Sequence, residues 1–200
     1  MTPQDEKRIR IVAVQGSVRD GNFTGKALAL VLDELGKHSS YTVDLFDPAG
    51  MILPPPGAST PSADATRLQE AVQKATGVVF ATPEYHGSFS STLKLVIENL
   101  GFPSLLAGKP IALLGVAAGA LGAIKSLEHL RSVCSHVGAI VLPGPVSVAG
   151  VQQVFDEKGR CLDAAIEKRI RRVATGLVDY IAGSICPRVA LEEMARKPLQ

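Results

Sequence analysis

The chain has 200 residues, of which 46% are hydrophobic and 20% charged, and a formal net charge of +2. This length suits one ordinary domain, and the composition excludes a disordered chain. The small net charge and the lack of any block of like charges argue against nucleic acid and against a membrane surface as partners.

The first part of the chain alternates strand-like and helix-like segments. Residues 9–14 form a short β-branched run that Gly16 ends, which predicts a buried strand. Residues 24–36 carry leucine and valine at the i, i+3, i+4, i+7 spacing of an amphipathic helix. Residues 41–46 alternate as a strand does, and the proline-rich segment 54–57 predicts an irregular loop.

The middle of the chain continues the same alternation. A helix is predicted over 65–75, with Ser62 as its N-terminal cap, and a strand over 78–81. Apolar residues at helical spacing predict a further helix over 93–100, and Gly101 occupies the usual C-terminal position.

The last part of the chain completes the pattern. Strands are predicted over 111–114 and 139–142, with a helix over 124–134 between them and a final helix over 166–181. Five strands then alternate strictly with five helices. Right-handed crossovers place the helices on both faces of a parallel sheet, so we expect one three-layer α/β domain over residues 1–200.

Two segments and one charge cluster lie outside this regular pattern. Residues 143–160 are too apolar for an idle linker, and we expect them to cover the sheet edge or to reach a partner subunit. With the core at about 8–185, residues 188–200 are predicted to be a tail that frays or lies on a neighbour. Three arginines of the last helix are expected to form a solvated face: Arg169, Arg171 and Arg172.

The loop after the first strand, residues 16–26, has the groups of a monophosphate site. It offers two hydroxyls, an amide and a guanidinium, which belong to Ser17, Thr24, Asn22 and Arg19. The helix behind it presents unpaired N–H groups and a positive dipole end. The loop lacks the GxGxxG spacing of a dinucleotide site and the GK[ST] of a P-loop. The alternative is a polar loop in which Thr24 only caps the helix.

The segment after the third strand combines a turn with an aromatic side chain. It reads Thr82-Pro83-Glu84-Tyr85-His86-Gly87. Pro83 and Gly87 bend the chain, so that backbone groups can face a flat ligand while Tyr85 supplies a ring beside it. The alternative is a surface turn with Glu84 and His86 in solvent.

The segment after the fourth strand, residues 115–123, consists mainly of glycine and alanine. Such small residues let a flat ligand approach the backbone closely. The alternative is tight packing of a helix on the sheet.

Together the three loops predict a binding site for FMN. In a doubly wound sheet, ligands bind at the carboxyl ends of the strands, and in the flavodoxin-like order 2-1-3-4-5 strands one and three flank the switch point. One phosphate pocket beside one planar pocket suits a flavin mononucleotide better than a dinucleotide. The predicted fold is therefore a three-layer flavodoxin-like α/β fold with a five-stranded parallel sheet.

The same motifs resemble a known family over about residues 8–142. Gly16-Ser17-Val18-Arg19 with Asn22 and Thr24, followed by residues 82–87 and Leu93-Lys94, looks like the NAD(P)H-dependent FMN reductases, which include quinone, azo-dye and chromate reductases. The resemblance implies that the phosphate is held by Ser17, Arg19, Asn22 and Thr24. It implies that the isoalloxazine is bordered by Pro83, Glu84, Tyr85, His86 and Gly87, with Ala117, Ala118 and Gly119 on its far side.

Several positions depart from the family's usual pattern. Asn22 stands where serine is usual, Thr24 where asparagine is usual, and His86 where asparagine is common, while Ser90-Ser91 replaces Pro-Gly and Leu95 stands where asparagine often follows the lysine. The first two exchanges keep hydrogen-bonding capacity. His86 lies where substrate would sit, so this position bears on substrate preference more than on flavin binding.

The function implied is an FMN-dependent NAD(P)H oxidoreductase with a ping-pong cycle. NADPH or NADH would pass hydride to bound FMN and leave, and a quinone, azo compound, flavin or metal oxyanion would take its place. We name no catalytic side chain and no metal ligand, and Tyr85 and His86 are the candidates to orient substrate. The family resemblance also implies a homodimer or homotetramer.

Two alternatives belong to other classes of protein. A flavodoxin-type electron carrier would lack hydride chemistry, and such carriers tend to be acidic, whereas this chain is slightly basic. A flavin-free α/β binding domain would gain no visible absorbance on addition of FMN.

The cysteines and the hydropathy predict a cytoplasmic protein. Cys134, Cys161 and Cys186 have no CxxC spacing, which argues against a metal site and a disulfide framework. Cys134 falls on an apolar helical stripe and is expected in the core. No apolar stretch approaches the roughly 18 residues of a membrane span.

Overall fold

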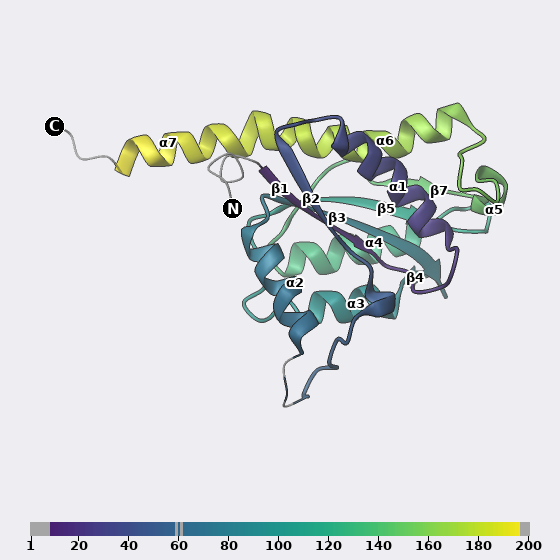
Figure 1. Ribbon diagram of the computed structural model, residues 1–200, viewed down its shortest axis with the longest axis horizontal. Helices are drawn as coiled ribbons and strands as arrows, with labels where there is room; N and C mark the ends of the chain where they lie inside the picture. The colour runs from purple at the N-terminus through teal and green to yellow at the C-terminus, as the bar shows by residue number, and fades with distance from the viewer. Residues whose placement is uncertain (1–8, 59, 61, 197–200) are drawn as a thin grey trace.

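The computed structural model describes residues 9–58, 60 and 62–196, and it shows a parallel β-sheet between two layers of helices (Figure 1). Five strands form the sheet in the order β2-β1-β3-β5-β6, and all pair in parallel. These strands are β1 (Ile9–Gln15), β2 (Tyr41–Phe46), β3 (Gly77–Tyr85), β5 (Pro110–Val116) and β6 (Ile140–Val141). This confirms the predicted strand order.

Two short strands add to the predicted five. The strand β4 (Ser88–Phe89) pairs antiparallel with the end of β3, and β7 (Val146–Val148) pairs in parallel with the end of β5. Each has two or three residues, which is too few to give an alternating pattern in the sequence.

The helices form two layers, one on each face of the sheet (Figure 1). The first layer holds α1 (Phe23–Gly36) and α6 (Ala164–Tyr180), and the second holds α2 (Ala63–Lys74), α3 (Ser91–Glu98) and α4 (Ile124–His136). Each layer packs on its own cluster of buried apolar side chains. In β1, Ile11 and Ala13 join the first cluster while Val12 and Val14 join the second, which explains the continuous apolar run of this strand.

The strand β3 is longer than predicted. It continues through Thr82 and Pro83, which pair with β5, to Glu84 and Tyr85, which pair with β4. The interpretation of residues 82–87 as a loop is therefore wrong for its first four members. The partner that keeps Glu84 and Tyr85 extended is the short strand β4, and the sequence pattern does not reveal it.

Residues 143–160 cover the sheet edge, which was one of the two expected roles. They contain β7 on the edge of β5, followed by the short helix α5 (Val151–Val154). Val148, Val151 and Val154 are buried in the first apolar cluster. The apolar content of this segment is thus explained within the chain itself.

The C-terminal residues form a helix where a tail was expected. After α6 the chain passes through a π-helical turn (Ile181–Ile185) into α7 (Cys186–Arg196), which has no buried residue. In Figure 1, α7 extends beyond the sheet in line with α6. Residues 197–200 of the predicted tail lie outside the described residues. Among the described residues, no helix is both long and apolar enough to cross a membrane.

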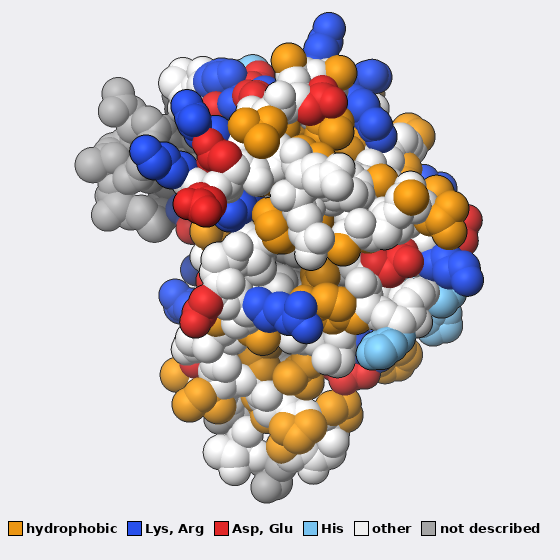
Figure 2. Space-filling model, turned by 90° about the vertical axis from the view of Figure 1, so that its right-hand side faces the viewer, with side chains coloured by type: hydrophobic (Ala, Val, Ile, Leu, Met, Phe, Trp, Pro, Cys, Tyr) orange, Lys and Arg blue, Asp and Glu red, His pale blue; other side chains and the backbone are white. Residues whose placement is uncertain are grey.

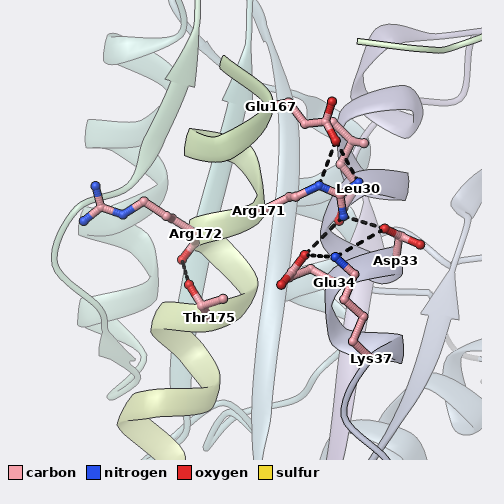
Figure 3. Close-up of polar contacts among 8 residues, drawn as sticks. All are labelled: Leu30, Asp33, Glu34, Lys37, Glu167, Arg171, Arg172 and Thr175. Atoms are coloured by element: carbon pink, nitrogen blue, oxygen red, sulfur yellow. Dashed lines mark hydrogen bonds and ion pairs between the residues drawn. The ribbon is translucent and has the colours of Figure 1, made fainter. Parts of the chain in front are cut away.

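Arg171 corrects the expectation of a solvated arginine face. Its side chain is only 23% exposed and forms ion pairs with Glu167 on its own helix and with Asp33 and Glu34 on α1 (Figure 3). The hydrogen bond to Asp33 comes first among the causes that raise the pKa of Arg171 far above its usual value. Arg171 therefore joins α6 to α1, whereas the neighbouring Arg172 is exposed.

Candidate functional site

The carboxyl ends of β1, β3 and β5 surround a cavity of about 410 Å³. It lies at the switch point of the sheet, where β1 is flanked by β2 on one side and β3 on the other. Nine of the predicted site residues line it: Ser17, Arg19, Asn22, Thr24, Pro83, Glu84, Tyr85, Ala117 and Ala118. The other three predicted site residues do not line it: His86, Gly87 and Gly119. His86 and Gly87 directly follow Tyr85 in the chain, and Gly119 directly follows Ala118.

The first wall is the loop between β1 and α1, and Gly16 fixes its start. The amide of Gly16 donates to the carbonyl of Ala81 at 2.7 Å, which holds the loop against β3. A Cβ atom at Gly16 would lie 2.5 Å from that same carbonyl oxygen. Only glycine permits this approach of the two strands.

Asn22 shapes this loop with both ends of its side-chain amide. Its Oδ1 accepts from the Gly25 amide at 2.7 Å and caps α1, while its Nδ2 donates to the Arg19 carbonyl at 2.7 Å. The helix cap is therefore Asn22, and the alternative in which Thr24 caps α1 is wrong. Asn22 lines the cavity, but its side chain is already engaged within the loop.

Ser17 and Thr24 differ from Asn22 because their hydroxyls remain available. Both residues are buried, with exposed fractions of 2% and 1%, and both line the cavity. Within the described part of the chain, neither hydroxyl forms a side-chain hydrogen bond. The first turn of α1 adds main-chain N–H groups that have no partner within the helix. Two hydroxyls and a helix N-terminus thus converge on one end of the cavity.

The second wall is the hairpin of β3 and β4. Tyr85 pairs with Ser88, and the two residues between them have positive φ angles, 51° for His86 and 73° for Gly87. A two-residue connection with both φ angles positive has the form of a type I′ turn. The turn carries His86 away from the cavity lining, although the main chain before it remains in that lining.

Arg19 joins the first wall to the second. Its guanidinium carbon lies 5.0 Å from the centroid of the Tyr85 ring, within the range of a cation–π contact. Arg19 is exposed and Tyr85 is half-buried. The charge expected at the phosphate end therefore rests over the aromatic ring of the hairpin.

Ser90 fixes the same two walls from beneath. Its buried hydroxyl donates to the Gly16 carbonyl at 2.5 Å and accepts from the Leu93 amide at 3.1 Å, where it caps α3. The Ser90 amide donates to the Thr82 hydroxyl at 3.2 Å. One residue therefore connects the first loop, β3 and α3. The sequence identified Ser90 only as a departure from the family's pattern, although a serine directly before a helix is the usual signal of a cap.

Glu84 has a role that the sequence reading missed. Its Oε2 accepts from the Ser126 amide at 3.1 Å, in the first turn of α4. The N-cap residue of this helix, Ala123, has no side chain able to cap it. The Glu84 carboxylate therefore supplies the missing cap. The alternative with Glu84 free in solvent is wrong.

The third wall follows β5, and both interpretations of its small residues apply. Ala117 and Ala118 line the cavity, and the Ala117 main chain is held by bonds to Val148 and Val151. At Gly115, however, a Cβ atom would lie 2.7 Å from that of Ala123. Gly115 is thus required by close packing of α4 on the sheet, and the alanines border the site.

The cavity lining also contains residues outside the predicted set. Val151 and Gln152 come from α5, which lies about thirty residues beyond the nearest predicted site residue. No sequence signal marks them, because a four-residue helix shows no periodicity. The remaining unpredicted members are adjacent to predicted ones: Asp20, Gly21, Phe23 and Val116.

The surface around the site is mixed in charge. Figure 2 views the side of the molecule on which α5 and β4 lie in Figure 1, and it shows basic, acidic and histidine side chains interspersed with hydrophobic ones. No single sign of charge dominates this face. The local cations that matter are therefore individual side chains such as Arg19.

The family model described as NADPH-dependent FMN reductase matches residues 9–153, which span the three walls of the cavity and α5. This match covers well over half of the chain. It confirms the family that the first two loops predicted, and with it the class of enzyme, an FMN-dependent oxidoreductase that uses a nicotinamide.

Individual relatives agree with the family model. An NAD(P)H-dependent FMN reductase of Pseudomonas aeruginosa is 30% identical over 176 residues, which is 82% of this chain and 90% of the relative. A quinone reductase of Escherichia coli is 28% identical over 186 residues, which is 90% of this chain and 93% of the relative.

A solved structure supports the fold. The flavoenzyme FerB of Paracoccus denitrificans, an NAD(P)H:acceptor oxidoreductase, superimposes with a TM-score of 0.72 at 23% identity. The comparison covers 88% of this chain and 98% of that structure. The predicted flavodoxin-like α/β fold is thereby confirmed. The chain belongs to the NADPH-dependent FMN reductase family.

Proposed function

We propose that the chain binds FMN in the cavity between the loops of β1, β3 and β5 and reduces small acceptors there at the expense of NADPH or NADH. One observation carries this proposal: the cavity joins buried, available hydroxyls at one end to a hairpin main chain and small residues at the other. A phosphate suits the first end and a flat ring the second.

At the phosphate end, the proposed ligands are Ser17, Thr24 and Arg19. The two hydroxyls can donate to phosphate oxygens, and the free amides of the α1 N-terminus add further donors. Arg19 is exposed above Tyr85, so its guanidinium can turn toward a phosphate at small cost. Asn22 contributes by holding the loop in shape.

At the ring end, the proposed contacts come from the main chain of the hairpin. Pro83, Glu84 and Tyr85 form one border of the cavity, and Ala117 and Ala118 form the opposite border. Gly119 continues that second border. His86 and Gly87 stand at the turn just outside the lining, where they can orient a substrate over the ring.

When bound, FMN would supply the redox chemistry that links a nicotinamide, as two-electron donor, to a quinone, azo compound, flavin or metal oxyanion as acceptor. One open face that serves donor and acceptor in turn gives a ping-pong cycle. The side chains of the lining supply position and electrostatics. Glu84, a possible acid or base, is already bonded to the α4 N-terminus, so we assign no catalytic side chain.

We further propose that the chain forms a homodimer or homotetramer. An apolar groove between α3 and α4 supports this, because it is lined by Ile97, Phe102 and Val133. Phe102 is 96% exposed in the single chain. An exposed aromatic side chain beside a groove is typical of a surface that another subunit covers. Light scattering of wild type and Phe102→Glu tests it: the variant should shift toward monomer.

A reducing, cytoplasmic location is part of the proposal. Cys134, Cys161 and Cys186 are all free thiols among the described residues. A chain that keeps three thiols unpaired suits a compartment where thiols stay reduced.

Titration with FMN followed by anaerobic stopped-flow reduction tests the function. Ser17→Ala/Thr24→Val should weaken FMN binding at least tenfold, whereas Ser135→Ala on the far part of α4 should not change it. Reduction of the FMN-loaded protein by NADPH or NADH alone, without a reductase partner, is expected and would exclude an electron carrier. A protein that gains no flavin absorbance would overturn the proposal.

A further inference from the structure

The sheet edge at β5 is interrupted beside α6. β6 pairs with Pro110 and Ile111, and β7 pairs with Leu114 and the residues after it. Between these two pairings, Ala112 and Leu113 have no strand partner on this edge within the described chain. The intervening segment is Leu142-Pro143-Gly144-Pro145, whose prolines have no N–H to donate to a neighbouring strand.

This gap opens into a cavity of about 290 Å³ between the edge and α6. Its walls are mainly apolar and include Ala112, Leu142 and Leu177, which are buried and belong to the apolar cluster on the α6 face, while Gly176 leaves room on the helix side. The volume is near the lower end for small-molecule sites. None of the residues that line it lines the FMN cavity.

The cavity is lined by one positively charged side chain, that of Arg172, and by no negatively charged one. In Figure 3 the Arg172 guanidinium points away from the network in which Arg171 meets its three carboxylates. No ion pair or hydrogen bond of the Arg172 guanidinium is present among the described residues. Arg131 and Arg169 reach the same edge and donate to the carbonyls of Leu142 and Ser147.

We propose that this groove is a second binding site, for a small organic anion with an apolar body and one carboxylate or sulfonate group. The anion pairs with the Arg172 guanidinium, whose fork of N–H donors suits two oxygens. Tyr180, at the opposite end of the α6 side of the groove, offers a hydroxyl as a further donor. The apolar body rests on Ala112, Leu142 and Leu177, so the site rejects strongly hydrated inorganic anions.

The test uses FMN-loaded protein and 8-anilinonaphthalene-1-sulfonate as the anionic probe, with its fluorescence as the readout. Arg172→Gln should weaken the binding of the probe at least tenfold. Arg67→Gln, which removes the same charge from α2 in the other helix layer, should change the affinity by less than twofold. Uncharged N-phenyl-1-naphthylamine should bind wild type and Arg172→Gln alike.

A second variant fills the groove and leaves its charge in place. A Cβ atom at Gly176 meets no other atom within 4 Å, so Gly176→Leu should fold normally and abolish the saturable probe signal. FMN reduction by NADPH should be unchanged in both variants, since neither residue lines the FMN cavity. Probe affinity that neither Arg172→Gln nor Gly176→Leu alters would overturn the proposal.

Discussion

The guanidinium of Arg19 lies over the ring of Tyr85, with 5.0 Å between the Cζ atom and the ring centroid. The two residues come from different walls of the FMN cavity, the loop after β1 and the end of β3. The contact brings the guanidinium of the proposed phosphate end to the aromatic side chain of the proposed ring end. A change at either residue should therefore be felt at both ends of the site.

Arg19→Ala should weaken FMN binding by about 1.5–3 kcal/mol, because a charge-assisted hydrogen bond to the phosphate is lost. Fluorescence titration of FMN measures this. Arg67→Ala is the matched control, since Arg67 also lies over an aromatic ring, that of Phe46, but outside the cavity. Equal affinities of wild type and Arg19→Ala would remove Arg19 from the phosphate site.

His86→Asn should stabilise the protein by up to about 1 kcal/mol. His86 has a φ of 51° in a type I′ turn, a conformation that asparagine adopts more easily than histidine. Urea unfolding of the FMN-free protein measures the change. Gly87→Ala should act in the opposite direction, because its φ is 73°.

The His86→Asn variant also tests whether His86 affects the choice of substrate independently of stability. If His86 orients the acceptor, His86→Asn should alter the ratio of kcat/KM for a quinone and an azo dye while raising stability. An asparagine variant that is less stable than wild type would contradict the strain at this turn.

Glu84→Ala should destabilise the protein by about 1 kcal/mol, because α4 loses the side-chain cap of its first turn. Glu84→Gln should retain part of this stability, since the amide oxygen still accepts from Ser126. Glu128→Ala, on the same helix outside its first turn, is the control for loss of one carboxylate. If thermal unfolding gives Glu84→Ala and Glu128→Ala the same Tm, Glu84 does not cap α4.

The ion pairs of Arg171 should make stability depend on pH in the acid range. The hydrogen bond from Arg171 lowers the pKa of Asp33, and the Lys37 hydrogen bond, with a further contribution from Arg171, lowers that of Glu34. A carboxyl with a lowered pKa in the folded state stabilises above its unfolded pKa, and this is lost as pH falls through the folded pKa. Thermal stability should therefore decline below about pH 4.

Arg171→Gln should flatten this acid decline and lower stability at neutral pH. Arg172→Gln is the control, because its guanidinium takes no part in the network. If both variants keep the wild-type dependence of Tm on pH, the pairing between α6 and α1 contributes nothing to acid stability.

Cys134 should resist alkylation in the folded protein, whereas Cys186 should react. Burial raises the pKa of the Cys134 thiol to about 12, and its side chain is fully buried, while Cys186 is exposed. The thiolate is the reactive form, so both accessibility and ionisation protect Cys134. Mass spectrometry after iodoacetamide at about pH 8 should find Cys134 modified only in denaturant.

The sequence was sufficient to predict the fold and most of the residues that line the cavity, for physical reasons. Parallel strands buried on both faces leave long β-branched runs such as residues 9–14, and amphipathic helices leave regular stripes, so the strand order could be predicted. The loops that line the cavity could be located because they follow strands that end at one edge of the sheet.

The parts that could not be predicted depend on partners distant in the sequence. Glu84 and Ser126 are separated by 42 residues, and no local pattern links a carboxylate to a helix that lacks its own cap. Gln152 reaches the cavity only because β7 pairs with β5 and places α5 beside Ala117. The pairing of Arg171 likewise needs α1 to lie beside α6.

The Ser90 hydroxyl, shared between the Gly16 carbonyl and the Leu93 amide, has a consequence for the rate and strength of binding. It holds the loop after β1 and the start of α3, which follows the hairpin, in one relative position through hydrogen bonds of the chain itself. The entropy of ordering these two segments is therefore lost during folding and does not count against the ligand. A preorganised cleft of this kind requires no conformational change to close over its ligand. We therefore expect FMN to bind in a single kinetic step.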